Sequence, residues 1–291
     1  MRRERFGAIR VTTAGLALVG FLVLALTAGC GSGTGQSSGP AAADPGQMLA
    51  EGSGRALAAG SVRFTGSATF GAGPPVTFDG VLSWSDGTTG EITMNGGGPT
   101  GPMVARITGD AIYTSMPPGM LAPMSDKRWG KYSFADMTTA MGPVGELFRA
   151  ALAETNPVRS AAMLLQAGDL QLVGEEQRNG VVTTHYAGTV DVTKLITDLR
   201  LGLTDEVLEA LRQESLAARI TSEKLDLWLD DRGFPIHAEV RTNDPTLGPV
   251  VWSADYRDYG GPQQVQAPPP NEVYDLGARM NAPPPLPSPP R

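Results

Sequence analysis

Alternation of apolar and polar positions is the dominant pattern of the chain beyond residue 60. Between Val62 and Phe70 the even positions are apolar or small and the odd positions are polar, and 76–84 repeats this order. A period of two is typical of strands with one face in water. Nine more strands, bounded by Gly, Pro, Asn and Asp, are predicted on the same grounds: 90–95, 103–108, 111–115, 128–133, 170–177, 181–191, 224–230, 235–242 and 250–259.

Helical patterns interrupt these strands. An alanine-rich stretch at 46–59 predicts a short helix ahead of the first strand. Apolar residues at helical spacing predict a helical region at 136–166, which Gly142-Pro143 and Asn156-Pro157 break, and a proline suits a first helical turn. A third pair of helices is predicted at 193–200 and 204–217, with Asp191 and Thr204 as N-caps.

The order of these elements favours an α+β fold. A mostly antiparallel sheet with helices inserted at a few points can be covered by helices on one face only. Asp230-Asp231-Arg232-Gly233 is a turn signal that makes 224–230 and 235–242 a hairpin. The elements together span 46–262, which is within the range of one domain.

The N-terminal residues 1–29 have the composition of a signal peptide. Four arginines precede an apolar run at 11–26, which ends in the small residues Thr27, Ala28 and Gly29. An uncleaved membrane helix is the alternative, but an apolar run of about 16 residues is short for a span. Arg2-Arg3 hints at twin-arginine export, although Phe6 stands one place late for that motif and general secretion is favoured.

Cys30 is the only cysteine of the 291 residues, and it follows the predicted signal peptide directly. An exported chain with one thiol has no partner for an internal disulfide, so the residue needs another role. Leu26-Thr27-Ala28-Gly29-Cys30 resembles the bacterial lipobox, although Thr27 stands where leucine is usual. We therefore predict a diacylglycerol on Cys30 that anchors the mature chain to the outer face of the cell membrane.

Both ends of the mature chain differ from the domain in composition. Residues 30–45 are rich in Gly and Ser and predict a flexible tether. Residues 263–291 carry the prolines 268–270 and the run 282–290, and we predict an extended tail there. A G-x-S-x-G match at 35–39 lacks the strand and helix that would activate a serine, so we treat it as accidental.

Charge excludes one class of partner. Loss of the signal peptide removes four arginines and Glu4, which leaves 19 basic and 29 acidic residues. A mature chain of that balance repels phosphate backbones, so nucleic acid is not expected as a partner.

Spaced residues across 46–259 carry a family resemblance. They are Phe64-Thr65-Gly66, Tyr113 followed by Trp129, Val182-Thr183-Thr184-His185-Tyr186-Ala187-Gly188, and Leu227-Trp228-Leu229-Asp230 with Gly233 and Pro235. In this order they resemble the actinobacterial LppX/LprG-type lipoproteins and their LolA-like relatives. The resemblance implies a curved, incomplete β-barrel whose concave face, covered by helices, encloses an apolar cavity for acyl chains.

The resemblance also implies a function, which is carriage of a lipid or glycolipid across the cell envelope, with an envelope transporter as a further partner. It implies no catalytic residue and no cofactor. The candidate residues for the cavity lining are Phe64, Phe78, Leu82, Met137, Met141, Val144 and Phe148. Methionines gather at 116–141, and methionine-rich surfaces adapt to varied apolar ligands, but core packing explains them equally well.

Two other classes of protein compete with the carrier. An enzyme is disfavoured because the only histidines, His185 and His237, fall inside predicted strands, where neither a zinc site nor a serine triad can be assembled. A non-carrier envelope protein, such as a sensor-associated or wall-binding scaffold, would fit the acidic surface and the proline-rich tail as well. Fold resemblance alone does not separate a carrier from a scaffold.

Overall fold

One open sheet organises the molecule. The computed structural model describes residues 44–85, 87–96, 101–116, 126–141, 157–192, 205, 208–209, 212–213, 216 and 221–281. In this part of the chain a single sheet has 12 strands. They are β1 (Ser61–Phe70), β2 (Val76–Ser83), β3 (Thr89–Asn95), β4 (Met103–Ile107), β5 (Ala111–Ser115), β6 (Trp129–Ser133), β7 (Gln171–Arg178), β8 (Val181–Asp191), β9 (Ser222–Leu229), β10 (Pro235–Asp244), β11 (Gly248–Arg257) and β12 (Val273–Asp275).

The sheet does not close into a barrel. Its order is β12-β6-β5-β4-β3-β2-β1-β11-β10-β9-β8-β7, so β12 and β7 lie at its two edges. Neighbouring strands pair antiparallel, except for β12 and β6, which are parallel. The predicted fold class, an incomplete and mostly antiparallel β-barrel with helices, is confirmed. Each of the eleven predicted strands is present, with ends close to those expected.

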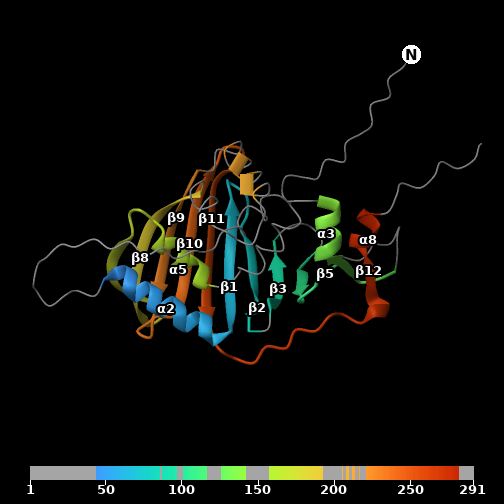
Figure 1. The fold of residues 1–291 in the computed structure, drawn as a ribbon, viewed down its shortest axis with the longest axis horizontal. Helices are drawn as coiled ribbons and strands as arrows, with labels where there is room; N and C mark the ends of the chain where they lie inside the picture. The colour runs from blue at the N-terminus through green and yellow to red at the C-terminus, as the bar shows by residue number, and fades with distance from the viewer. Residues whose placement is uncertain are drawn as a thin grey trace, which may run out of the picture.

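Four helices of the described chain pack at two places on the sheet (Figure 1). These helices are α2 (Pro45–Ala59), α3 (Phe134–Met141), α5 (Val158–Leu165) and α8 (Leu276–Met280). The Asp44 side chain caps α2 by accepting from the Gly46 N–H, and Gly60 ends it with a φ of 74°. The predicted helix at 193–200 lies outside the described residues. Within the predicted helix at 204–217, the described residues 205, 208–209, 212–213 and 216 are helical.

Helices α2 and α5 cover one half of the sheet, over β8, β9 and β10. We call the covered face the inner face; it carries Phe64, Tyr186 and Leu227, and the opposite face is the outer face. Leu49 of α2 and Leu164 of α5 are fully buried there with strand residues. Close approach needs glycine, because a Cβ on Gly52 would lie 2.3 Å from the carbonyl oxygen of Gly233.

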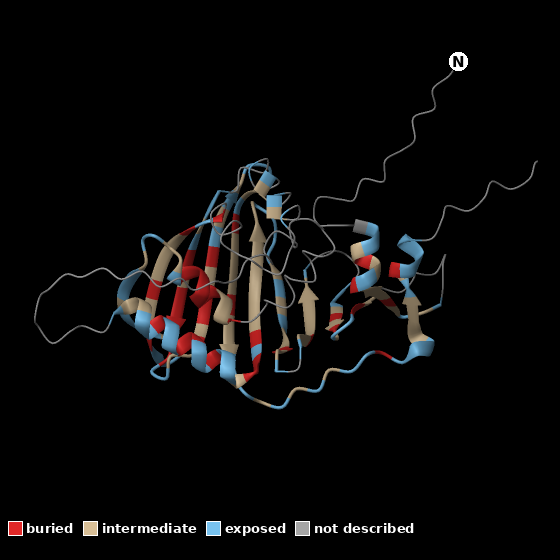
Figure 2. Ribbon diagram, viewed as in Figure 1, coloured by how far each residue is buried: buried red, intermediate tan, exposed pale blue. Residues whose placement is uncertain are grey.

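Helix α3 closes part of the other half. Phe134 and Met137 of this helix are buried against residues of four strands, which are Val62, Phe64, Leu82, Ile107 and Ile112. The most continuous burial lies under α2 and α5, whereas the middle strands β1, β2 and β3 are largely half-buried (Figure 2). Two separate cores therefore support the sheet, with a less covered region between them.

The C-terminal part of the chain differs from the predicted tail. Residues 270–281 form a 3₁₀ turn, β12 and α8, and β12 pairs with β6 at the edge of the sheet. The segment before them runs along the lower side of the sheet in Figure 1. Asn281 donates from Nδ2 to the carbonyl oxygen of Asp136, 3.1 Å away. Prolines 268–270 precede β12 and the next prolines follow α8, so none falls within the strand or the helix. The prediction of a tail from 263 onward was therefore wrong for 270–281.

Candidate functional site

The less covered region of the inner face is apolar. Its partly exposed side chains form what we call the inner band: Phe70, Phe78, Met94, Met103 and Trp252. The strand register places them on one face in adjacent rows, because Phe78 pairs with Met94 and Met94 with Met103. Phe78 and Trp252 stack with ring centroids 5.9 Å apart and an angle of 16° between the planes. The result is a continuous aromatic and methionine surface.

A glycine leaves room for the Phe78 ring of the inner band. Gly66 lies between Phe78 and Ala254 in the pairing of β2, β1 and β11. A Cβ there would come within 2.4 Å of the Phe78 ring and 2.3 Å of the Ser253 carbonyl oxygen. Any larger residue at this position would displace the Phe78 ring, so glycine is required for the observed position of this ring in the inner band.

The structure brings four of the predicted lining residues together. Phe64, Leu82 and Met137 are buried in the core beneath α3, and Phe78 packs against the same core from the inner band. Val144, Phe148 and the side chain of Met141 lie outside the described residues, as does Cys30. Whether these residues line a lipid site stays a prediction. The sequence did not single out Phe70, Met94, Met103 and Trp252, although the period-two pattern places them on the same face.

One acidic residue lies at the covered end of the inner face. Glu223, near the start of β9, pairs with Val190, which is buried in the core under α5. Burial raises the pKa of the Glu223 carboxyl to about 7, and the positive charge of Arg159 on α5 opposes part of that shift. A carboxyl of this kind changes its charge near neutral pH.

The outer face carries an aromatic and charged cluster. Trp228 of β9 is buried, and its ring stacks on His185 at a centroid distance of 4.2 Å. The guanidinium of Arg178 lies 4.0 Å from the centroid of the same ring, and His237 meets it edge-on at 5.0 Å. The indole N–H donates to Glu176. These contacts hold the β7–β8 hairpin against β9 and β10.

Hydrogen bonds fix the role of each histidine in that cluster. His185 lies between two carboxylates, with Nε2 2.8 Å from Asp226 and Nδ1 3.0 Å from Glu176. His237 accepts at Nε2 from Arg178 and donates from Nδ1 to Asp255, both at 2.8 Å. Burial lowers the pKa of His237, while its hydrogen bond to Asp255 acts in the opposite direction. Both imidazoles thus serve as structural bridges between strands.

The described residues offer neither a metal centre nor a membrane span. Within these ranges no group of three or more His, Cys, Asp or Glu side chains is arranged to hold a metal ion. Among the described helices, none combines the length and the hydropathy that a membrane-spanning segment needs.

Comparison with known proteins finds relatives by sequence and, separately, solved structures with a similar fold. No protein-family model matches the chain. An uncharacterized 31.2 kDa protein of Streptomyces griseus is 28% identical over 227 residues, which is 74% of this chain and 74% of that protein. A Streptomyces coelicolor protein described as a "Putative lipoprotein" is 28% identical over 228 residues, covering 75% of this chain and 70% of the relative.

Solved structures with a similar fold include two mycobacterial lipoproteins. LppX of Mycobacterium tuberculosis matches with a TM-score of 0.47 and 14% identity, over 77% of this chain and 100% of its own. LprF of Mycobacterium bovis matches with a TM-score of 0.44 and 12% identity, over 77% of this chain and 96% of its own. LppX and LprF are two of the solved structures to which this chain is similar.

Proposed function

We propose that this chain is a lipoprotein of the bacterial cell envelope that binds the acyl chains of a lipid or glycolipid on its inner face and carries them across the envelope. Cys30 bears the diacylglycerol that anchors the protein on the extracytoplasmic side of the membrane. An envelope transporter is the expected source or acceptor of the cargo. The relative described as a lipoprotein supports the anchoring, and the inner band supports the lipid site.

The inner band is the observation that carries this proposal. Its aromatic and methionine side chains are only partly buried, although they lie on the face that elsewhere holds the two cores. Apolar surface in water favours an apolar partner by about 25 cal/mol for each Å² that becomes buried. Acyl chains are long, flexible and free of polar atoms, so they suit a flat apolar floor between two helical covers.

Anchoring has a direct test. Replacement of Cys30 by alanine removes the only thiol, so we expect this variant to carry no acyl chains and to escape lipoprotein signal peptidase. Mass spectrometry of the N-terminus of both proteins measures the result. A wild-type chain without a modification on Cys30, or one that still begins at Met1, would contradict the proposed anchor.

Lipid binding is tested by filling the site. Ala68 lies on the inner face opposite Trp252, whereas its neighbour Thr69 points to the outer face. We expect Ala68→Trp to reduce the lipid that organic solvent extracts from the purified protein, with a small change in thermal stability, and Thr69→Trp to retain wild-type lipid. Val144→Trp, in the predicted helical cover, should act as Ala68→Trp does. Overpacking of a filled core would instead cost about 1–3 kcal/mol of stability.

The same experiment separates the carrier from a scaffold. A scaffold with a close-packed inner face would contain no extractable lipid, and both Ala68→Trp and Val144→Trp would lower its stability. That combination of results would refute the proposed carrier and favour a sensor-associated or wall-binding role.

A further inference from the structure

A pocket of about 580 Å³ opens where two strands part. The pairing of β10 with β11 starts at His237 and Asp255, while β11 continues beside β1 as far as Arg257. On its other side, β10 pairs with β9, and that pairing is irregular between Pro235 and His237. The hydroxyl of Tyr259 donates to the Pro235 carbonyl oxygen, 2.7 Å away. The residues of β10 before His237 thus lie outside the pairing with β11, and the pocket opens there.

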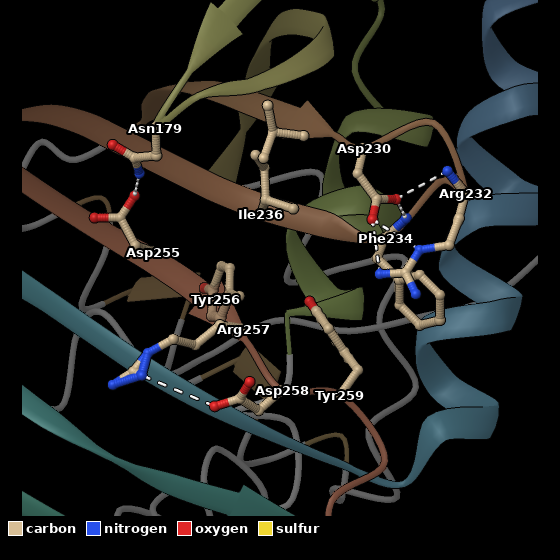
Figure 3. Close-up of a pocket in the computed structure, with 11 residues that line it drawn as sticks. Asn179, Asp230, Arg232, Phe234, Ile236, Asp255, Tyr256, Arg257, Asp258 and Tyr259 are labelled. Carbon is tan, nitrogen blue, oxygen red and sulfur yellow. Dashed lines mark hydrogen bonds and ion pairs between the residues drawn. The ribbon is translucent and has the colours of Figure 1, made fainter.

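One wall of this pocket is aromatic and apolar. Figure 3 shows Ile236, Tyr256 and Tyr259 between the two strands, with Phe234 beside them. The rings of Phe234 and Tyr259 pack with centroids 4.8 Å apart. Ring faces and an isoleucine bind the C–H surface of a ligand, not its charge. The volume is in the range of small-molecule sites, which is about 300–1,000 Å³.

Paired charges form the rim of the pocket. Asp230 accepts from Arg232 at 3.0 Å, and Asp258 lies 3.9 Å from Arg257. Oδ1 of Asp255 accepts from the Asn179 side chain at 3.1 Å, as Figure 3 shows, and from Nδ1 of His237 at 2.8 Å. Each rim carboxylate thus has a cationic or polar partner within the protein.

This arrangement selects the chemistry of a ligand. An anion would face Asp230, Asp255 and Asp258, and a cation would face the guanidinium groups of Arg232 and Arg257. Neutral hydroxyl groups meet neither obstacle. Both oxygens of Asp230 are already used by Arg232 and Phe234, but Asp255 and Asp258 have acceptor sites left, and a guanidinium has five donors. A ring with an apolar face and hydroxyls at its edge matches the aromatic wall and the compensated rim.

We propose that the pocket between the start of β10 and the end of β11 binds a neutral sugar ring. The sugar belongs either to a soluble or wall glycan or to the head group of a glycolipid; the recognition chemistry is the same for both. The site involves no residue of the inner band, and the inference does not rest on the proposed lipid carriage.

The test uses the purified full-length protein in phosphatidylcholine nanodiscs. Chitotriose serves as the soluble neutral sugar, monoglucosyl diacylglycerol in the nanodisc as the glycolipid, and glucose 6-phosphate as the charged control. Hydrogen–deuterium exchange of 230–236 and 255–259 is the readout. At a ligand concentration of ten times Kd, we expect exchange there to slow by about tenfold. Slowing by chitotriose assigns the site to glycans, and slowing by the glycolipid alone assigns it to a head group.

A matched pair of variants places the binding. Val181 lines the pocket, whereas Val182 is its exposed neighbour outside the lining. Val181→Trp should fill the space and weaken sugar binding by about tenfold or more, which corresponds to about 1.4 kcal/mol, and Val182→Trp should leave it unchanged. Both positions are partly exposed, so thermal unfolding is expected to stay near that of the wild type.

Several results would overturn the proposal. They are no change in exchange with either neutral probe, tighter binding of glucose 6-phosphate than of chitotriose, and binding that survives Val181→Trp or is lost equally in Val182→Trp. None of these outcomes bears on extractable lipid, so failure of the sugar site and failure of the lipid site can be told apart.

Discussion

Glu223→Gln tests whether an acid is truly buried beside the core under α5. The residue sits opposite Val190 at the covered end of the inner face, and burial raises the pKa of its carboxyl from 4.5 to about 7. Glutamine keeps the size of the side chain and removes the titration. The substitution therefore isolates the free energy of ionising this one group in the folded protein.

The sign and size of the effect follow from linkage. Between about pH 4.5 and 7 the folded chain holds a proton on Glu223 that the unfolded chain has lost, so wild-type stability falls as the pH rises through this window. A raised pKa of this size corresponds to at most about 3 kcal/mol. We expect Glu223→Gln to match the wild type near pH 4 and to exceed it by up to about 3 kcal/mol near pH 8.

Urea unfolding at a series of pH values measures this difference directly. Glu175→Gln is the control, because it makes the same chemical change at an exposed position on the edge strand β7, away from the covered end of the inner face. A stability difference between Glu223→Gln and the wild type that stays constant from about pH 4 to 8 would refute the inference that the carboxyl is neutralised by burial.

Three further predictions concern the helices, the C-terminal segment and the outer cluster. Gly52→Ala should destabilise the protein by about 1–3 kcal/mol in urea unfolding, because its Cβ would meet the Gly233 carbonyl, whereas Gly54→Ala, with open space around it, should be neutral or stabilising. Removal of 282–291 should barely change the midpoint of thermal unfolding. Removal of 270–291 should lower the midpoint by several degrees, because β6 loses its contacts with β12 and α8. Equal midpoints for the two truncations would contradict this prediction. Burial lowers the pKa of His237, so below about pH 6.5 the unfolded chain binds a proton at this residue more readily than the folded chain does, and the free energy of unfolding falls. In His237→Asn we expect this fall to be smaller. A dependence on pH equal to that of the wild type would argue against the burial of His237.

The strands could be predicted because their signal is local. Side chains of a strand alternate between two faces, so Val62–Phe70 shows from sequence alone which residues share a face. Pairing later places Phe64 beside Tyr256, nearly 200 positions away, on that same face. The helix at 46–59 was predicted from its composition, whereas its caps Asp44 and Gly60 were not, although they too act within a few residues of the helix ends.

The alternation of apolar and polar residues does not predict which residues are buried where both faces of a strand are covered. Leu225, Leu227 and Leu229 of β9 are buried on the inner face, as alternation indicates. Trp228 is buried on the outer face as well, because Arg178 and His185 from the β7–β8 hairpin lie against its ring. Such coverage depends on a hairpin about 40–50 positions away in the chain, and no local pattern records it.

The chain by itself thus predicted export and a lipid on Cys30, and it determined the strand positions and the side-chain faces, since each is encoded over a few neighbouring residues. Tertiary structure alone decided which apolar residues are covered by helices and which remain in the inner band. It also decided that β12 joins β6, and that β10 pairs with β11 only from His237 onward, where a pocket opens. These features arise from contacts between distant strands, whose partners are set by the global pairing of the sheet and not by the composition of either strand.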